Sequence, residues 1–196
     1  MMQLVCPTVS LIKEYACHFA DEPNTGQFAL ALQKLVAKFP RNDDLSDVCL
    51  KVAAINSMYA TKINAVFVVA QHIHNLKIDD RLKRGERTLV DDIARVQIGE
   101  KVRINYSFSS KYCSWHNPDA FAKYDSYVDY LLWNYQLQDK FIRNDFKQSE
   151  MWGNYPRFME ILLTFREYFH LAEITLQELD DFLWLYGQKV YNAVHP

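Results

Sequence analysis

The chain has 196 residues, 49% of them hydrophobic, including 12 Phe, 12 Tyr and 4 Trp. This apolar content is enough for a sizeable core and excludes a disordered protein. Gly and Pro number only 5 and 6, too few for the many tight turns of an all-β protein, so the composition favours helices. The net charge of −2 excludes a protein that coats nucleic acid with a uniformly basic surface.

We expect neither a membrane segment nor a secretory segment. The longest purely apolar run covers residues 65–70, far short of the roughly 20 residues that span a bilayer. Residues 1–15 have neither a basic region nor a cleavage site of small residues, so we expect no signal peptide and no membrane partner. The cysteines form no CxxC pair, which predicts buried or half-buried free thiols in a reducing cytoplasm. They are Cys6, Cys17, Cys49 and Cys113.

Apolar residues recur at helical spacing along most of the chain. This pattern predicts an all-α fold: one compact domain over residues 1–196, with about nine helices and no strand. A capping Thr25 opens the second helix and Pro40 closes it. The other helices expected in the first half cover residues 9–20, 45–59, 61–76 and 88–97, and the charged residues 77–85 form a loop or a short helix.

The second half is predicted mainly from its turns and caps. Residues 104–115 end as a helix, residues 117–119 form a turn, and Asp125 opens the next helix. A helix over residues 156–169 follows. Thr175 and Glu178 form a capping box before the last helix. The apolar stripe that we expect to pack this helix on the core is Leu179, Phe182, Leu183 and Tyr186, and the acids Glu178, Asp180 and Asp181 suit its dipole.

One segment, NYSFSSKYCSWHNPDAFAKYDSY over residues 105–127, resembles the catalytic stretch of the helix-hairpin-helix DNA glycosylases. In that superfamily a hairpin of the form L-P-G-x-G-x-K is followed by a helix, a turn and an Asp that starts the next helix. Ser107–Ser109 fall at the Gly-x-Gly of the hairpin, Lys111 at the family lysine and Asp125 at the family aspartate. Residues 178–188 also resemble uncharacterised bacterial relatives that carry SKY…P…F…YDS motifs.

The resemblance implies a glycosylase-like helical bundle that binds DNA and excises or recognises a damaged or modified base. No cysteine cluster for an iron–sulfur centre follows the motif, so we expect no cofactor. A lysine amine attacks the sugar C1′ and forms a Schiff base, provided that its pKa is low enough to leave some of it neutral. A carboxylate beside it stabilises the positive charge that develops on the sugar. The resemblance therefore implies a DNA glycosylase or AP lyase in which Lys111 and Asp125 face one another across a cleft.

DNA contacts are expected from two places. In the resemblance, the hairpin residues Ser107, Ser109 and Ser110 meet a phosphate. In addition, residues 77–111 contain nine Lys or Arg against six Asp or Glu, a balance that suits a basic face with salt-dependent binding. Its candidate residues are Arg81, Lys83, Arg84 and Arg103. The alternative is a mixed, solvated surface with no ligand.

A base excised from DNA must first leave the duplex and enter a pocket, where aromatic side chains receive it. The pocket residues that we predict are Asn56, Tyr59, Thr61, Trp115 and His116, and we expect the last two to be exposed. Structural alternatives stay open. Asn56 satisfies a buried backbone group and Thr61 caps the fourth helix, while Lys111 is a solvated amine and Asp125 an ordinary helix cap.

No metal site is expected, because His72 and His74 point away from one another on a helix, and Cys113 and His116 lack two further ligands. Two other functions remain open beside the glycosylase. One is a catalytically inactive helical module that binds a protein or a nucleic acid, for example in a bacterial defence system. The other is a structural helical protein without a site.

Overall fold

A computed structural model describes residues 3–195 of the chain. These residues form ten α-helices, one 3-10 helix (η1) and one antiparallel pair of strands, so the mainly helical fold is confirmed. None of the described helices is long and apolar enough to cross a bilayer. In chain order, the elements are α1 (Val9–Asp21), α2 (Pro23–Lys38), α3 (Leu45–Tyr59), α4 (Val66–Asn75), α5 (Asp79–Lys83), α6 (Thr88–Ala94), β1 (Arg95–Ile98), β2 (Lys101–Ile104), α7 (Tyr106–His116), α8 (Ser126–Asp139), η1 (Gln148–Glu150), α9 (Tyr155–Tyr168) and α10 (Leu176–Val194).

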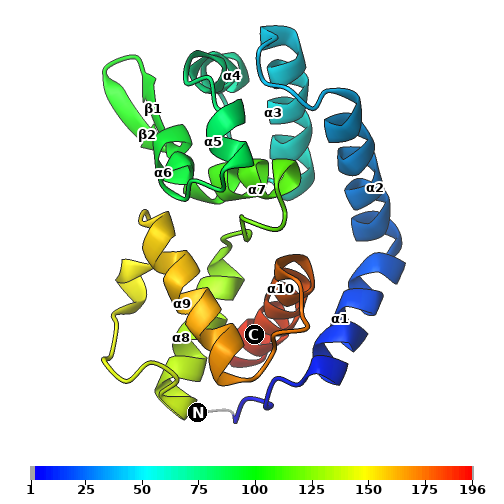
Figure 1. Cartoon of the computed structure of the whole chain (residues 1–196), viewed down its shortest axis with the longest axis vertical. Helices are drawn as coiled ribbons and strands as arrows, with labels where there is room; N and C mark the ends of the chain where they lie inside the picture. The colour runs from blue at the N-terminus through cyan, green and yellow to red at the C-terminus, as the bar shows by residue number, and fades with distance from the viewer. Residues whose placement is uncertain (1–2, 196) are drawn as a thin grey trace.

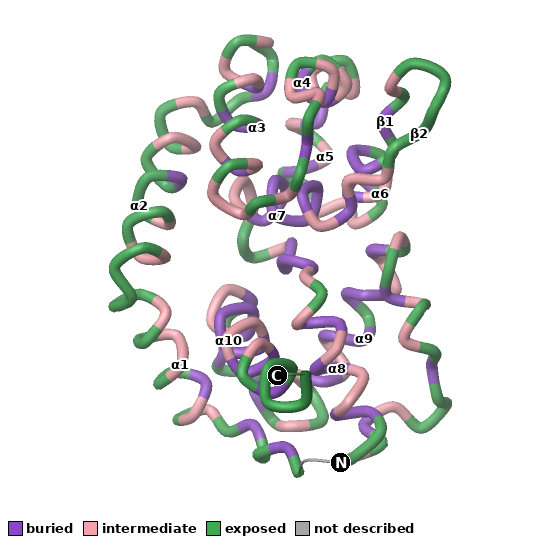
Figure 2. The backbone as a smooth tube through the Cα atoms, turned by 180° about the vertical axis from the view of Figure 1, so that it is seen from behind, coloured by how far each residue is buried: buried purple, intermediate pink, exposed green. Residues whose placement is uncertain are grey.

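The helices lie in two groups, as Figure 1 shows. Helices α3 to α7 and the strand pair form one group, and α8, α9 and α10 form the other. Helices α1 and α2 run along one side of both groups, where α1 packs on α10 and α2 packs on α3 and α7. Buried backbone follows the inner faces of both groups (Figure 2). The segment 117–125, between α7 and α8, carries the chain from the first group to the second.

The strand pair corrects the prediction of a helix over residues 88–97. Helix α6 ends at Ala94, and β1 then pairs with β2 in the register Arg95↔Ile104. Gly99 lies in the tight turn between the strands and has a φ of +61°, which favours glycine. Each strand has four residues in which Val or Ile alternates with a polar residue, a strand pattern too short to stand out from its helical neighbours.

Two helix starts also differ from the prediction. Helix α2 begins at Pro23, and the side chain of Glu22 caps it by accepting a hydrogen bond from the backbone N–H of Thr25 at 2.6 Å. Helix α4 begins at Val66, and its first residue has no side-chain cap, so Thr61 does not cap it. The capping box of Thr175 and Glu178 at the start of α10 is confirmed.

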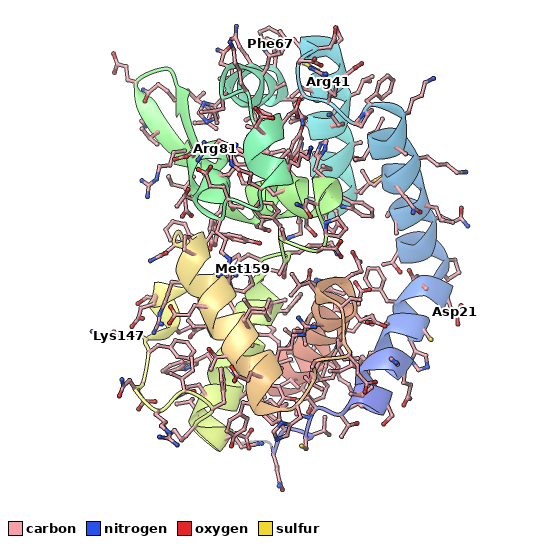
Figure 3. The ribbon with its side chains drawn as sticks, in the orientation of Figure 1. Asp21, Arg41, Phe67, Arg81, Lys147 and Met159 are labelled. Carbon is pink, nitrogen blue, oxygen red and sulfur yellow. The ribbon has the colours of Figure 1, made fainter. Side chains whose placement is uncertain are left out.

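The interior is filled by side chains from both groups, with Met159 buried and Asp21 and Lys147 exposed at the edge (Figure 3). The stripe on α10 is confirmed as core, because Leu179, Phe182 and Leu183 are fully buried. Across from it, the ring of α1 residue Tyr15 meets Phe182 edge to face, with 5.3 Å between the centroids. The cysteines depart from expectation, since Cys6 and Cys17 are exposed.

Truncation of this stripe tests the packing. We expect Phe182→Ala to lower the free energy of unfolding by about 3–5 kcal/mol, because it removes a fully buried aromatic ring. The matched control is Phe67→Ala on α4, where the residue is 57% exposed and the loss should stay below about 1 kcal/mol. Urea unfolding measures both. Equal losses in the two variants would contradict the assignment of α10 to the core.

Candidate functional site

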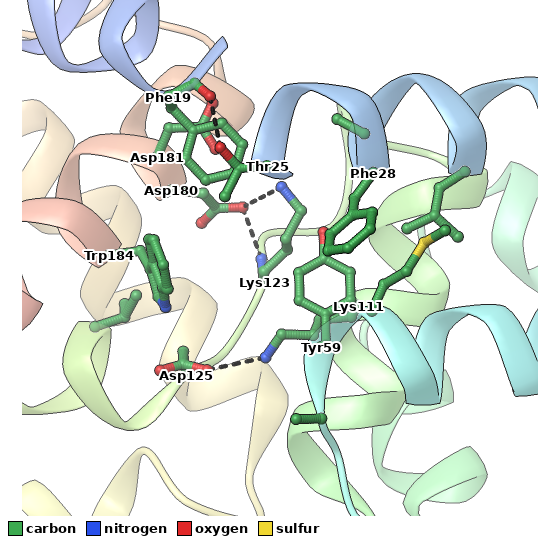
Figure 4. Close-up of a pocket in the computed structure, with 15 residues that line it drawn as sticks. Phe19, Thr25, Phe28, Tyr59, Lys111, Lys123, Asp125, Asp180, Asp181 and Trp184 are labelled. Atoms are coloured by element: carbon green, nitrogen blue, oxygen red, sulfur yellow. Dashed lines mark hydrogen bonds and ion pairs between the residues drawn. The ribbon is translucent and has the colours of Figure 1, made fainter. Parts of the chain in front are cut away.

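A pocket of about 240 Å³ opens between α2, α3, α10 and the segment that joins α7 to α8 (Figure 4). Its wall is largely apolar, and four aromatic side chains contribute to it: Phe19, Phe28, Tyr59 and Trp184. Phe28 is 46% exposed although it lies in phase with the apolar positions of α2. Two lysines and three aspartates also line this pocket: Lys111, Lys123, Asp125, Asp180 and Asp181.

Lys111 and Asp125 lie side by side in this pocket. The Lys111 Nζ donates hydrogen bonds to Asp125 Oδ2 at 3.0 Å, to the Tyr124 carbonyl oxygen at 3.1 Å and to Ser107 Oγ at 2.6 Å. The two residues therefore meet although 14 positions separate them, but they are in direct contact rather than facing one another across a cleft. The interpretation of Lys111 as a solvated amine is wrong, because its side chain is only 4% exposed.

The local course of the chain explains this contact. Helix α7 ends at the turn after His116, and the chain then returns alongside the helix. The Ser110 hydroxyl holds it there by accepting a hydrogen bond from the backbone N–H of Tyr124 at 2.9 Å. Because Lys111 follows Ser110 and Asp125 follows Tyr124, the same contact brings the amine and the carboxylate together.

Burial lowers the pKa of Lys111 below its ordinary value, and the charge of Asp125 only partly opposes this effect. A lowered pKa leaves more of the amine neutral near pH 7, and the neutral amine is the nucleophilic form. The Nζ also lies 5.3 Å from the centroid of the Tyr59 ring, where the face of the ring attracts a cation. In its protonated form the amine is thus held by three acceptors and by the face of the Tyr59 ring.

Asp125 has two contacts at once. Its Oδ1 accepts a hydrogen bond from the backbone N–H of Tyr127 at 3.2 Å and caps α8, while Oδ2 accepts from Lys111. The helix-cap interpretation is therefore confirmed, and it is compatible with a place beside the amine. The side chain of Asp125 is 22% exposed, so a ligand in the pocket has access to this carboxylate.

A second lysine–aspartate pair, which was not predicted from the sequence, lies in the same pocket. Asp180 Oδ2 accepts a hydrogen bond from the backbone N–H of Lys123 at 2.8 Å and lies 3.9 Å from its Nζ. Burial raises the pKa of Asp180 to about 7, although Lys123 opposes the shift. Asp181 is also buried, and Gln177 donates a hydrogen bond to it at 3.3 Å.

One signal in the sequence could have revealed Asp180. Leu176, Leu183, Gly187 and Val190 are all buried in α10. Asp180 lies at helical spacing from them, in phase with a buried face, where a carboxylate needs a specific reason to be present. No comparable pattern marks Lys123, which lies in an irregular segment 57 residues from its partner.

Of the five predicted pocket residues, only Tyr59 lines the pocket. Its hydroxyl accepts a hydrogen bond from Trp115 Nε1 at 3.1 Å. Asn56 and Thr61 do not line the pocket, because the Asn56 side chain bonds the backbone of Ile63 and the hydroxyl of Thr61. This amide shapes the irregular turn before α4, which supports the structural alternative for Asn56.

Trp115 and His116 are half-buried, so the expectation that they are exposed is wrong. Trp115 lines a larger and more open groove of about 690 Å³ beside the pocket, together with Pro118 and Asp181. His116 lines neither cavity, and burial lowers its pKa to about 3. Its imidazole is therefore neutral at ordinary pH and carries no charge toward a ligand.

The serines do not form the predicted hairpin loop. Residues 107–110 lie in the first turns of α7. Ser109 and Ser110 are fully buried, and their hydroxyls donate to the carbonyl oxygens of Asn105 and Ser107 within the helix. Neither can contact a phosphate in this conformation. Ser107 instead accepts a hydrogen bond from Lys111 and helps to position its amine.

Part of the predicted basic face is already paired with acidic side chains. Arg81 binds Glu86 and Asp92, each at 2.6 Å, so its charge is already paired. Lys83 on α5 is exposed, as are the neighbouring Arg84, which reaches Glu86 at 3.4 Å, and Arg103 on β2. None of the four basic residues lines either cavity, and contact between them and DNA stays a prediction.

The pH dependence of stability tests the environment of Asp180. The pKa of Asp180 in the folded chain is about 7, above the ordinary 3.8. Between pH 3.8 and pH 7, Asp180 is therefore more protonated in the folded chain than in the unfolded chain. Asp180 therefore favours folding at low pH and loses this contribution as pH rises through about 7. Asp180→Asn does not titrate, so its stability relative to the natural chain should increase from pH 4 to pH 7. Urea unfolding at both values, with exposed Asp119→Asn as control, checks this. A constant difference would contradict the assigned environment.

Two comparisons relate the chain to known proteins. The HI_0787_N family model, described as an N-terminal domain, matches residues 11–120. An uncharacterised protein of Haemophilus influenzae is 42% identical over 175 residues, which cover 88% of this chain and 83% of the relative. No solved structure matches the chain significantly. Neither match is to a helix-hairpin-helix DNA glycosylase. The family model covers more than half of the chain, so the chain belongs to the HI_0787_N family.

Proposed function

We propose that the chain excises a base from DNA as a glycosylase with lyase activity, using Lys111 as the nucleophile and Asp125 as its partner. The observation that carries this proposal is a buried amine 3.0 Å from a helix-capping carboxylate, at the wall of an aromatic pocket. The order of parts also follows the glycosylase pattern, with the lysine on one helix and the aspartate at the start of the next. The hairpin that the resemblance implies is not part of this support.

The chemistry requires a neutral amine and a nearby anion. The Lys111 nitrogen attacks C1′ of the sugar, the bond from C1′ to the base breaks, and the base leaves with the electron pair. Asp125 stabilises the positive charge on the sugar during this step and receives the proton that the amine must lose. Opening of the sugar ring then gives a Schiff base between the lysine and C1′. Release of the base precedes any cleavage of the strand.

The rest of the pocket suits a base that has left the duplex. Flipped bases are held between aromatic or apolar side chains, and such side chains form most of this wall. In this proposal the phosphates are bound by the exposed cations Lys83, Arg84 and Arg103, and binding weakens as salt rises. We place the protein in the cytoplasm, where bacterial DNA lies.

Borohydride trapping on a duplex with one abasic site tests the proposal. The lysine condenses with the sugar aldehyde and releases water, and hydride reduces the resulting Schiff base to a stable amine. We expect a covalent protein–DNA product from the natural chain and a loss of roughly 100-fold or more in Lys111→Gln. The matched control is Lys189→Gln, an exposed lysine on α10, which should trap normally. Absence of a trapped product from the folded natural chain would reject the proposal.

The pH profile of trapping tests the role of Asp125. Its charge raises the pKa of Lys111 against the larger effect of burial. Asp125→Asn should therefore lower that pKa further, and the midpoint of the rate profile should move to lower pH even though the maximal rate falls. Single-turnover trapping rates across the pH range measure this, with Asp119→Asn as the control. A midpoint that stays in place or moves upward would mean that Asp125 does not act on the amine.

A further inference from the structure

The part of the pocket away from Lys111 contains polar groups that the proposed chemistry does not use. Figure 4 shows the Lys111–Asp125 pair and the Lys123–Asp180 pair at separate places on the pocket wall, with Tyr59 beside the two lysines. The first pair suffices for attack on a sugar. The second pair consequently calls for its own explanation.

Only one of the two carboxylate oxygens of Asp180 has a hydrogen-bond donor. It is 3% exposed, and its Oδ2 receives the backbone N–H of Lys123 at 2.8 Å. Its Oδ1 is buried and has no hydrogen-bond partner among residues 3–195. A buried carboxylate oxygen without a donor is costly and uncommon, because the oxygen loses its water and gains nothing in return. A ligand with an N–H group would supply the missing donor.

The Lys123 ammonium is only loosely paired, and its Nζ also lies 5.8 Å from the centroid of the Trp115 ring. Its nearest carboxylate is Asp180 at 3.9 Å, beyond hydrogen-bond distance, and the described residues offer its Nζ no hydrogen bond. The side chain is 10% exposed and lines the pocket. Lys123 thus brings an unused donor close to the unused acceptor of Asp180. A ligand that fits both needs a donor and an acceptor next to one another.

The shape of the pocket restricts the ligand further. At about 240 Å³ the pocket is smaller than the roughly 300–1,000 Å³ of sites for drug-sized molecules. Aromatic side chains on its wall favour a flat ring that stacks on them. We infer that Asp180 and Lys123 recognise the edge of a nucleobase, with Asp180 Oδ1 accepting from a ring N–H and Lys123 Nζ donating to the adjacent carbonyl oxygen. This inference rests on the proposed function and names its substrate as a base with a cyclic amide edge.

Matched methylated bases test this recognition. 1-Methyluracil keeps the amide edge and has a methyl group in place of the sugar, whereas 1,3-dimethyluracil has a second methyl group on the remaining ring nitrogen and therefore has no ring N–H. The corresponding purines are 9-methylhypoxanthine and 1,9-dimethylhypoxanthine. We expect the open-edge member of at least one pair to bind at least tenfold more tightly than its blocked partner. Chemical-shift titration of the natural chain measures all four.

Asp180→Asn assigns the effect to this residue. The Lys123 N–H still needs an acceptor, so the new amide oxygen takes the place of Oδ2, and the NH₂ group faces the ligand where Oδ1 was. An acceptor becomes a donor at nearly constant size, and binding of the open-edge base should fall at least tenfold. Lys123→Gln should weaken it as well. Asp119→Asn, an exposed change of the same charge, should leave it intact, and thermal unfolding verifies that each variant is folded.

Trapping on abasic DNA separates this inference from the proposed function, because that substrate has no base to recognise. Trapping by the natural chain reports on the chemistry of Lys111, whereas the loss of base binding in Asp180→Asn reports on recognition of the base. If no base binds, if blocked bases bind as well as open ones, or if folded Asp180→Asn binds normally, the inference is wrong even when the natural chain traps. Binding of open-edge bases that depends on Asp180, without any trapping, would keep the inference and reject the excision chemistry.

Discussion

The ion pair between Lys111 and Asp125 joins the two groups of helices and also lines the pocket. Lys111 projects from α7, the last helix of the first group, and Asp125 caps α8, the first helix of the second. Asp125 also caps α8 through its other oxygen, and the Ser110 hydroxyl, one residue before Lys111, holds the intervening segment along α7. The ion pair brings chemistry from both groups to one wall, which neither group would provide alone.

A buried ion pair of this kind adds little to the free energy of unfolding. Burial removes water from both charges, and an apolar replacement of similar size often keeps or raises stability. The pocket contains this pair, a second lysine–aspartate pair and a carboxylate oxygen without a donor. A fold that only needed a packed interface between its two helix groups would be better served by leucines. The arrangement is better explained by a ligand that uses these groups.

The sequence predicted the parts of this structure that depend on neighbouring residues. Thr175 and Glu178 lie three positions apart, so their capping box could be identified directly. The Lys111–Asp125 contact was predicted from motif order rather than from physics. Asp180 and Lys123 could not be paired, because their contact arises only when α10 packs against the segment before α8. The turn before α4 was missed for a similar reason, since Asn56 bonds backbone groups seven residues away.

The serines show how a motif can mislead. Ser107–Ser109 align with a glycine loop, yet side chains of this kind are compatible with a helix, and the chain forms one. A phosphate-binding hairpin does not follow from the alignment. The lysine four residues after Ser107 keeps its place, because one turn of helix stacks its amine on the Ser107 hydroxyl. The amine and the carboxylate thus lie together although the residues before Lys111 form a helix instead of a hairpin.

The central claim is that one particular amine, among many, reacts with the sugar. Peptide mapping by mass spectrometry of the borohydride-reduced protein–DNA product tests this claim most directly, since it identifies the modified residue without any substitution. We expect the adduct on Lys111, and we expect Lys123, the other lysine of the pocket, to stay unmodified. An adduct on Lys123, or adducts spread over exposed lysines, would contradict this claim.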